Sequence, residues 1–125
     1  MKRLLWLDDI RNPKMSDWLL SYAPKYAYGE GEVIWVKNYD EFVNWIEQNG
    51  LPDMICFDHD LAEEKSGYDC AKWLVEYCMD NNLPVPKFNI QSANPSGKIN
   101  IKSLLDNYQG FYERQNKDDH NNPDI

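Results

Sequence analysis

Two stretches of the chain, KRLLWLDD at positions 2–9 and MICFDHD at positions 54–60, determine which fold this sequence can adopt. Each is a short apolar run that ends in acidic residues. Runs of this length without alternation are typical of strands that are buried on both faces, as in parallel sheets. Apolar residues make up 42% of the 125 residues, which is enough for one hydrophobic core. The sequence therefore predicts one domain built on buried strands with carboxylates at their ends.

The other segments alternate between helix and strand patterns. Two of the helices open with a capping-box pattern, in which a cap residue is followed three positions later by an acid. The predicted elements are strands at 2–7, 33–36, 54–57 and 87–91 and helices at 38–50, 66–79 and 98–108. The segment 16–26 is ambiguous because Pro24 limits any helix there, and residues 111–112 are a candidate for a short edge strand. This alternation predicts an α/β fold with three layers, in which helices cover both faces of a mostly parallel sheet.

Composition limits the organisation and the partners of the chain. The domain is predicted at 1–114, because residues 115–125 are polar and acidic and are interpreted as a flexible tail. With a formal net charge of −8, the chain gains no bulk attraction to nucleic-acid backbones. No apolar stretch is long enough to span a membrane, and Asp8 and Asp9 interrupt the N-terminal run, so a signal peptide is not expected. The three cysteines are interpreted as buried thiols of a cytoplasmic protein.

The acidic residues that follow the first and third predicted strands point to a metal site. Asp8, Asp9, Asp58 and Asp60 would meet at one edge of a parallel sheet, where ligands bind in such folds. Carboxylates so close together repel each other unless a proton or a cation neutralises them. Oxygen ligands of this kind suit Mg²⁺ or Mn²⁺. The alternative is that these acids only cap loops and helices or lie in solvent.

This arrangement of acids resembles the receiver domains of response regulators. On that pattern Asp8 and Asp9 match the metal-binding acidic pair, and Asp58 matches the phosphoacceptor at the end of the third strand. Asp60 matches the residue whose backbone carbonyl binds metal, and Ser92 matches a hydroxyl residue that contacts the phosphoryl group. The chain departs from the pattern in its truncated first helix and in lacking a fifth strand that ends in lysine. The missing lysine argues against a phosphoacceptor role for Asp58, and the acidic surface argues against a metal nuclease.

A longer set of motifs resembles a more specific family, the cyclic-phosphate-processing receiver-like domains of phages and bacteria. These motifs are LDDIRNP (7–13), NYDEF (38–42), FDHDL (57–61), SGYD (66–69) and SANPSG (92–97). The resemblance implies a receiver (flavodoxin-like) fold with a weak or missing fifth strand, in the cytoplasm of a bacterium or a phage-infected cell. It implies a Mg²⁺- or Mn²⁺-dependent phosphoesterase that acts on a cyclic phosphate of a nucleotide-derived small molecule, with Asp9 and Asp58 as catalytic residues.

The same resemblance also leaves a non-catalytic reading open. Many members carry histidine where this chain has Gln91, so a catalytic imidazole is missing at that position. With Ser92, Gln91 is then expected to contact the substrate. The alternative function is a binding module that sequesters a ligand or a protein partner on the receiver scaffold, for example in phage–host interaction.

The residues around the acids indicate how a phosphate could be handled. Arg11 could bind phosphate through two N–H groups, or it could form a salt bridge with one of the aspartates. His59 could donate a proton to a leaving alkoxide, or it could be a structural histidine that orients its loop. Asn94 and Lys98 lie at the start of the last helix, where free N–H groups and the helix dipole favour an anion.

Overall fold

The computed structural model describes residues 1–29 and 31–120, apart from the side chains of residues 118–120. Its strands are β1 (Lys2–Leu7), β2 (Gly31–Val36), β3 (Met54–Phe57) and β4 (Lys87–Ile90), and its helices are α1 (Trp18–Tyr22), α2 (Pro24–Ala27), α3 (Tyr39–Asn49), α4 (Gly67–Asn81) and α5 (Pro95–His120). The strands form one parallel sheet in the order β2-β1-β3-β4. The predicted α/β fold with a parallel sheet is confirmed.

The register of the sheet brings the carboxyl ends of the strands level with one another. Leu7 is the Cα partner of both Val36 and Phe57, and Phe57 is the partner of Ile90. The next residue of each strand continues this row through a backbone hydrogen bond. The N–H of Asp8 donates to the Val36 carbonyl (3.0 Å), that of Asp58 to the Leu7 carbonyl (2.9 Å), and that of Gln91 to the Phe57 carbonyl (2.9 Å). Three polar side chains therefore start from one line at the edge of the sheet.

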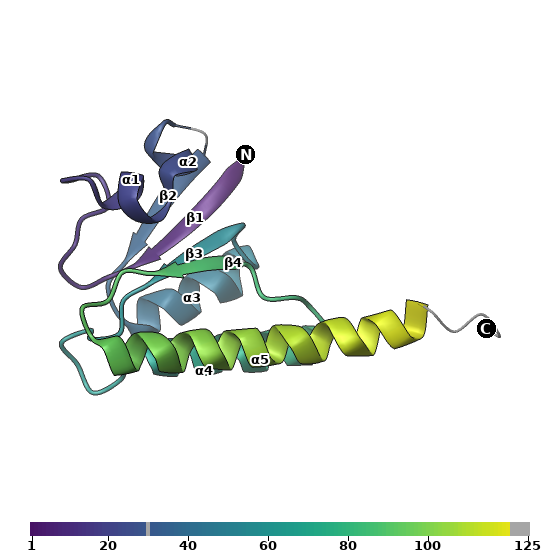
Figure 1. The fold of residues 1–125 in the computed structure, drawn as a ribbon. Coiled ribbons are helices and arrows are strands. Elements are labelled where there is room, and N and C mark those ends of the chain that lie inside the picture. The colour runs from purple at the N-terminus through teal and green to yellow at the C-terminus, as the bar shows by residue number, and fades with distance from the viewer. Residues whose placement is uncertain (30, 121–125) are drawn as a thin grey trace.

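One face of the sheet carries the larger core. Successive side chains of a strand point to opposite faces, and Leu7 and Phe57 point to this one. They share a buried cluster with Phe42 of α3, Leu74 of α4 and Leu105 of α5. Figure 1 shows these three helices together below the sheet. They cover this face along its full length and support the strand ends from which the acidic side chains start.

The opposite face is covered by much less of the chain. Leu4, Trp6 and Cys56 pack there against Ala23 and Tyr26. In the described residues, the helices on this side are α1, of five residues, and α2, of four (Figure 1). The segment that the sequence left ambiguous thus forms two short helices, and the truncated first helix is confirmed. The described residues after β4 add no fifth strand.

The last helix is the main error of the sequence-based prediction. It was expected at 98–108, but α5 runs from Pro95 to His120. Residues 111–112 lie inside this helix and form no edge strand, and the helix passes the predicted boundary at residue 114. Its first half is anchored in the core through Ile101 and Leu105. Once a helix is nucleated, each further residue adds one hydrogen bond, so the helix can continue past the packed part. Residues 121–125 of the predicted tail lie outside the described part of the chain.

Two other expectations from composition can be compared with the structure. Cys56, Cys70 and Cys78 are buried free thiols, as predicted. Burial raises the pKa of the Cys56 thiol to about 12, so this group is not a reactive thiolate. None of the described helices is long and apolar enough to cross a membrane.

Candidate metal and phosphate site

Three carboxylates meet at the carboxyl ends of β1 and β3. Asp8, Asp9 and Asp58 each offer one oxygen, and these oxygens lie within 4.8 Å of one another. Asp8 is fully buried and Asp58 is 4% exposed, whereas Asp9 is partly exposed. The level strand ends explain the arrangement, because Asp8 and Asp58 both come one residue after paired strand positions. The sequence-based grouping of these three acids therefore agrees with the geometry.

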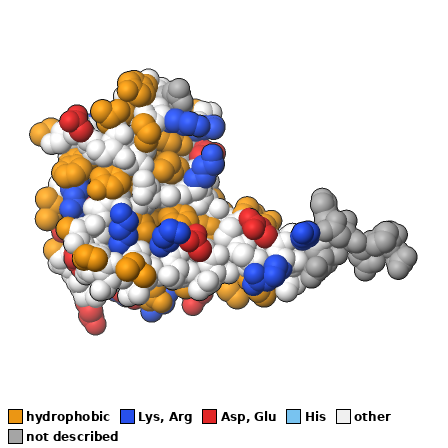
Figure 2. All heavy atoms as spheres, viewed as in Figure 1, with side chains coloured by type: hydrophobic (Ala, Val, Ile, Leu, Met, Phe, Trp, Pro, Cys, Tyr) orange, Lys and Arg blue, Asp and Glu red, His pale blue; other side chains and the backbone are white. Residues whose placement is uncertain are grey.

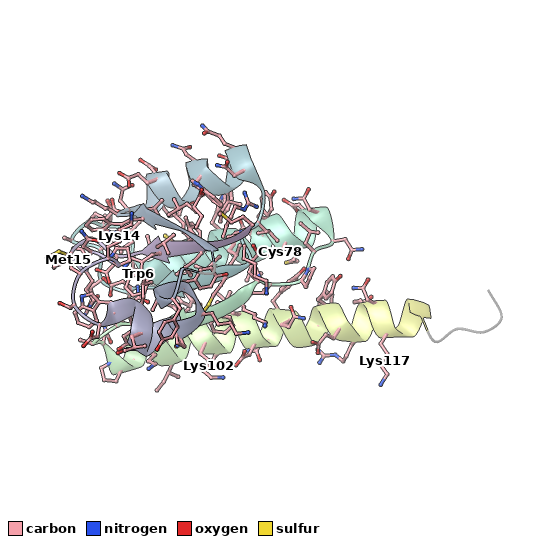
Figure 3. The ribbon with its side chains drawn as sticks, turned by 90° about the horizontal axis from the view of Figure 1, so that it is seen from above. Trp6, Lys14, Met15, Cys78, Lys102 and Lys117 are labelled. Atoms are coloured by element: carbon pink, nitrogen blue, oxygen red, sulfur yellow. The ribbon has the colours of Figure 1, made fainter. Side chains whose placement is uncertain are left out.

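The carboxylate of Asp8 is held rigidly by its own loop. Its Oδ1 accepts hydrogen bonds from the backbone N–H groups of Ile10 (3.0 Å) and Arg11 (2.8 Å). Its Oδ2 accepts a third from Arg11 Nη1 at 3.1 Å. Lys14 and Met15 belong to this loop, and Figure 3 shows them at the same end of the molecule as Trp6, whose indole N–H donates to the Arg11 carbonyl (2.9 Å). Position 8 is thus a preorganised anionic centre.

Asp58 has the most perturbed acidity in the site. Burial is the largest cause, and the neighbouring charge of Asp8 and the hydrogen bond and charge of Asp9 act in the same direction. Together they raise the pKa of Asp58 from 3.8 to about 7, although Arg11 acts against them. Near neutral pH the group is therefore partly protonated. A bound proton does here what a divalent cation would also do, which is to relieve repulsion among crowded carboxylates.

Arg11 is the positive charge that the chain itself places among these acids. Its Nη1 lies 3.1 Å from Asp8 Oδ2 and 3.6 Å from Asp58 Oδ1. Its guanidinium also lies over the ring of Trp18, 5.2 Å from the ring centre. Of the two interpretations of Arg11, the salt bridge is the contact that the structure shows. Its contact with phosphate stays a prediction.

Gln91 lies behind the carboxylates. Its side chain is 1% exposed, and its Nε2 donates to the Leu7 carbonyl at 3.0 Å and lies 3.5 Å from Asp8 Oδ2. Its Oε1 is buried and has no hydrogen-bond partner in the described residues. Gln91 therefore supports Asp8, and its contact with substrate stays a prediction.

His59 and Asp60 follow Asp58 in the chain but are not part of the three-carboxylate cluster. The His59 ring packs directly on Gly97 of α5, where an added Cβ would lie 2.4 Å from ring carbon atoms. Its Nδ1 lies 2.9 Å from Asp60 Oδ1 and 3.4 Å from Asn94 Nδ2. The Asp60 side chain is 70% exposed and is not one of the grouped carboxylates. A role as side-chain ligand is thus unsupported for Asp60, while a carbonyl contact with metal stays a prediction.

The start of α5 forms the other wall of the site. Ser92 Oγ accepts from the backbone N–H of Asn94 (3.0 Å), and Asn94 Oδ1 accepts from that of Gly97 (2.9 Å). Asn94 thus caps the helix and uses one of the N–H groups that an anion could have bound. Lys98 follows in the first turn with an exposed side chain. These residues lie together, as predicted, and their binding of phosphate stays a prediction.

Two residues that shape the site were not predicted from the sequence. Trp18 supports Arg11, but nothing in the local sequence pairs a tryptophan of α1 with the loop after β1. Gly67 starts α4 with its backbone against Asp58, because an added Cβ would lie 1.8 Å from the Asp58 carbonyl oxygen. Its N–H also donates to the His59 carbonyl (2.7 Å). The Ser-Gly pair at the helix start is the signal for Gly67 in the sequence, but a Ser-Gly pair also fits a simple helix cap.

A family comparison covers most of the chain. The sequence model of a family described as "Cyclic-phosphate processing Receiver domain" matches residues 3–107. No curated protein matches the chain.

Solved structures of receiver domains share the fold. The chain resembles the receiver domain of the Francisella response regulator 1452 at 15% identity and a TM-score of 0.50, over 92% of this chain and 99% of that one. It resembles NtrX from Brucella abortus in complex with ATP at 11% identity and a TM-score of 0.52, over 92% of this chain and 28% of that one. A fusion carrying the trimeric coiled coil of yeast Spc42 matches at 17% identity and a TM-score of 0.56, over 98% of this chain and 87% of that one. At these identities the likeness shows the fold alone.

Proposed function

The chain belongs to the cyclic-phosphate processing receiver domain family, and from this we propose that it is a divalent-metal-dependent phosphoesterase. Its substrate would be a cyclic phosphate of a nucleotide-derived small molecule. The observation that carries the proposal is the cluster of Asp8, Asp9 and Asp58, whose carboxylate oxygens lie within 4.8 Å of one another at the strand ends.

The residues present fit Mg²⁺ or Mn²⁺. Asp8, Asp9 and Asp58 supply hard oxygen ligands. After burial, the charges of Asp8 and Asp9 contribute to the raised pKa of Asp58, and a bound cation would relieve the repulsion among these acids. When bound, such an ion polarises a phosphoryl oxygen and makes the phosphorus more electrophilic.

Residues on both walls would bind and orient the phosphate. With a cation held by Asp8 and Asp58, the guanidinium of Arg11 would no longer be needed to balance their charge and would be free to bind two phosphate oxygens. Lys98, Asn94 and Ser92 at the start of α5 would bind the phosphate from the opposite side. These side chains come from different loops, so a ligand between them would be held on two sides.

Proton transfer would then complete ring opening. Attack of water on phosphorus forms a new P–O bond and breaks the P–O bond of the ring, with the proton of the water passing to a carboxylate of Asp9 or Asp58. The leaving alkoxide needs a proton in return. His59 can supply it from Nε2, because Asp60 and Asn94 contact the ring through Nδ1. Asp60 would orient the imidazole in this role.

A non-catalytic binding module is the second candidate, and one observation favours it. Gln91 stands where the family often has histidine, and its side chain is buried behind Asp8. An amide does not titrate near neutral pH and cannot act as a general acid or base, which leaves His59 as the single imidazole in the described site. On this alternative the chain binds a cyclic phosphate or a protein partner without cleaving it.

Turnover assays separate the two candidates. The protein is incubated with 2′,3′-cyclic nucleotides and with cyclic phosphates of ADP-ribose, in Mg²⁺, in Mn²⁺ and in EDTA. We expect a phosphomonoester product with either metal, no product in EDTA, and loss of product in Asp9→Asn and Asp58→Asn. Asp106→Asn, on the exposed surface of α5, is the matched control and should retain turnover.

The outcomes discriminate clearly. Metal-dependent binding of these ligands without turnover would refute the hydrolase and establish the binding module. Turnover that survives both Asp9→Asn and Asp58→Asn would refute the metal site.

A further inference from the structure

A second cavity lies at the opposite end of the sheet from the carboxylates. Its volume is about 340 Å³, and it is lined by Lys2, Ala23, Pro24, Lys25, Tyr26, Asp53, Met54 and Lys87. These residues belong to α2, to the residue before it and to the amino ends of β1, β3 and β4. At about 3.3 Å per residue, the six steps along β1 from Lys2 to Asp8 separate this cavity from the acidic cluster by roughly 20 Å. The proposed reaction makes no use of it.

The cavity has a rigid, largely apolar wall. Met54 and Lys87 are Cα partners in neighbouring strands, so their side chains start side by side on the thinly covered face of the sheet. The Tyr26 ring is fixed against Gly31, where an added Cβ would lie 2.8 Å from Tyr26 Cε1. Tyr26 is 8% exposed, so its ring holds its position without a ligand. The cavity exists because α1 and α2 are too short to cover this face.

The charge of the cavity is opposite to that of the chain. Lys2, Lys25 and Lys87 line it, and within the described residues no carboxylate lies within 4 Å of their ammonium groups. Asp53, the acid in the lining, already accepts a hydrogen bond from the Arg3 backbone N–H at 2.7 Å. Figure 2 shows basic side chains next to hydrophobic ones at the end of the molecule that carries the N-terminus and α2.

Among the lysines that the structure describes, Lys72 pairs with Asp69 and Lys102 with Asp106. Three lysines that line one cavity without a carboxylate partner are a local concentration of positive charge in a protein with a net charge of −8, and this charge would attract an anion.

We propose that this cavity binds a small organic phosphomonoester with an aromatic or apolar body, in class a nucleoside monophosphate. Three ammonium groups and one carboxylate, that of Asp53, leave the lining with a formal net charge of +2, which matches a phosphate dianion. Lysine binds phosphate as a point charge. Tyr26, Pro24 and Met54 provide apolar surface for the body of the ligand, and the volume is in the range of small-molecule sites. A ligand bound here leaves the carboxyl ends of the strands free for the proposed substrate.

Methyl NMR tests the proposal, with AMP as the probe. Met54 lines the cavity, whereas Met15 lies in the loop after β1 at the other end of the sheet (Figure 3). In EDTA, AMP should shift the Met54 methyl signal and leave that of Met15 in place. The double variant Lys2→Gln/Lys87→Gln should weaken this binding by about tenfold or more. Raising the ionic strength from about 0.05 M to about 0.5 M should weaken it as well.

Matched controls and reference ligands make the test decisive. Lys102→Gln on the exposed surface of α5 (Figure 3) and Asp9→Asn in the acidic cluster should bind AMP as the unmodified protein does. Adenosine and inorganic phosphate should each bind much more weakly than AMP. Equal binding of AMP and inorganic phosphate would overturn the ligand class. A response that moves Met15, needs Mg²⁺ or is lost in Asp9→Asn would overturn the location, and no shift of Met54 at about 5 mM AMP would overturn the site.

Discussion

Arg11 acts as an internal counter-cation for the acids of the site. Its guanidinium lies 3.1 Å from Asp8 and 3.6 Å from Asp58, supported on one side by the ring of Trp18. A divalent cation bound to the same carboxylates must compete with this positive charge. Competition of this kind couples metal binding to the release of an arginine that can then bind phosphate.

Replacing this arginine should therefore strengthen metal binding. In Arg11→Gln we expect the affinity for Mn²⁺ to rise about three- to tenfold, because the ion no longer displaces a cation. Affinity for a cyclic nucleotide in the presence of metal should fall by at least a similar factor. Calorimetric titration of the metal and then of the ligand measures both. Lys14→Gln, an exposed basic residue of the same loop, is the matched control, and an unchanged or weaker Mn²⁺ affinity in Arg11→Gln would contradict the counter-cation role.

Asp58 should make the stability of the metal-free protein depend on pH. Its pKa is raised to about 7 in the folded state by burial and by the charge of Asp8. An acid whose folded pKa lies above its unfolded pKa contributes stability that is fully present below about pH 4 and is lost as the pH rises through about 7. The loss should be on the order of a few kcal/mol at most. Urea unfolding in EDTA between pH 5 and pH 8 measures it as a falling free energy of unfolding.

A substitution assigns that slope to one residue. Asp58→Asn should remove most of the fall between pH 5 and pH 8, because an amide does not titrate there. Asp106→Asn, on the exposed surface of α5, should keep it. If the free energy of unfolding falls equally with pH in Asp58→Asn and in the unmodified protein, Asp58 is not the residue that causes the fall.

At the scale of elements, α4 positions the acidic loop through its first residue. Gly67 lies so close to Asp58 that an added Cβ would be 1.8 Å from the Asp58 carbonyl oxygen. The helix start is fixed in turn by Asp69, whose Oδ2 accepts from the Ser66 backbone N–H at 2.8 Å. That hydrogen bond lowers the pKa of Asp69. The capping box thus fixes the start of α4 against the end of β3, the strand that Asp58 follows.

Enlarging this glycine should damage both the fold and the site. Gly67→Ala forces the backbone of the helix start and of Asp58 apart, and we expect a loss of about 2 kcal/mol or more in the free energy of unfolding. Mn²⁺ affinity should fall with it. Gly110→Ala is the matched control, since its added Cβ meets only the flexible end of Arg114 at 3.3 Å and should be neutral or stabilising by up to about 1 kcal/mol. Chemical unfolding and metal titration of both variants check this, and equal effects would contradict the positioning role.

Local patterns predicted the elements that carry the acids and missed features set by distant contacts. The apolar runs that end at Asp8 and Asp58, and the caps at Asn38 and Ser66, are determined by neighbouring residues, so they could be recognised in the sequence. The length of α5 could not, because its continuation past Tyr108 follows from packing of its first half.

At the scale of the whole molecule, some features of the site follow from the order of the elements and others depend on how distant elements pack. Grouping of the three aspartates follows from the parallel order of strands, which the alternation of elements predicted. Trp18 beside Arg11 and the burial of Gln91 depend on how separate elements pack. The cavity lined by the lysines exists because the helices cover only part of one face of the sheet. No local sequence pattern predicts that part of a sheet face stays uncovered.

Metal binding should stabilise the molecule as a unit, because the ligands come from two strands in the centre of its one sheet. Folding stability rises by about 2.7 kcal/mol when the free ion reaches a hundred times its dissociation constant. For a domain of this size, that corresponds to an increase in Tm on the order of 10 °C. Scanning calorimetry with MgCl₂ and with NaCl of equal ionic strength should show the rise in Mg²⁺ alone and abolish it in Asp9→Asn. An equal rise in both salts would mean that general screening of the −8 net charge, and not a bound ion, stabilises the fold.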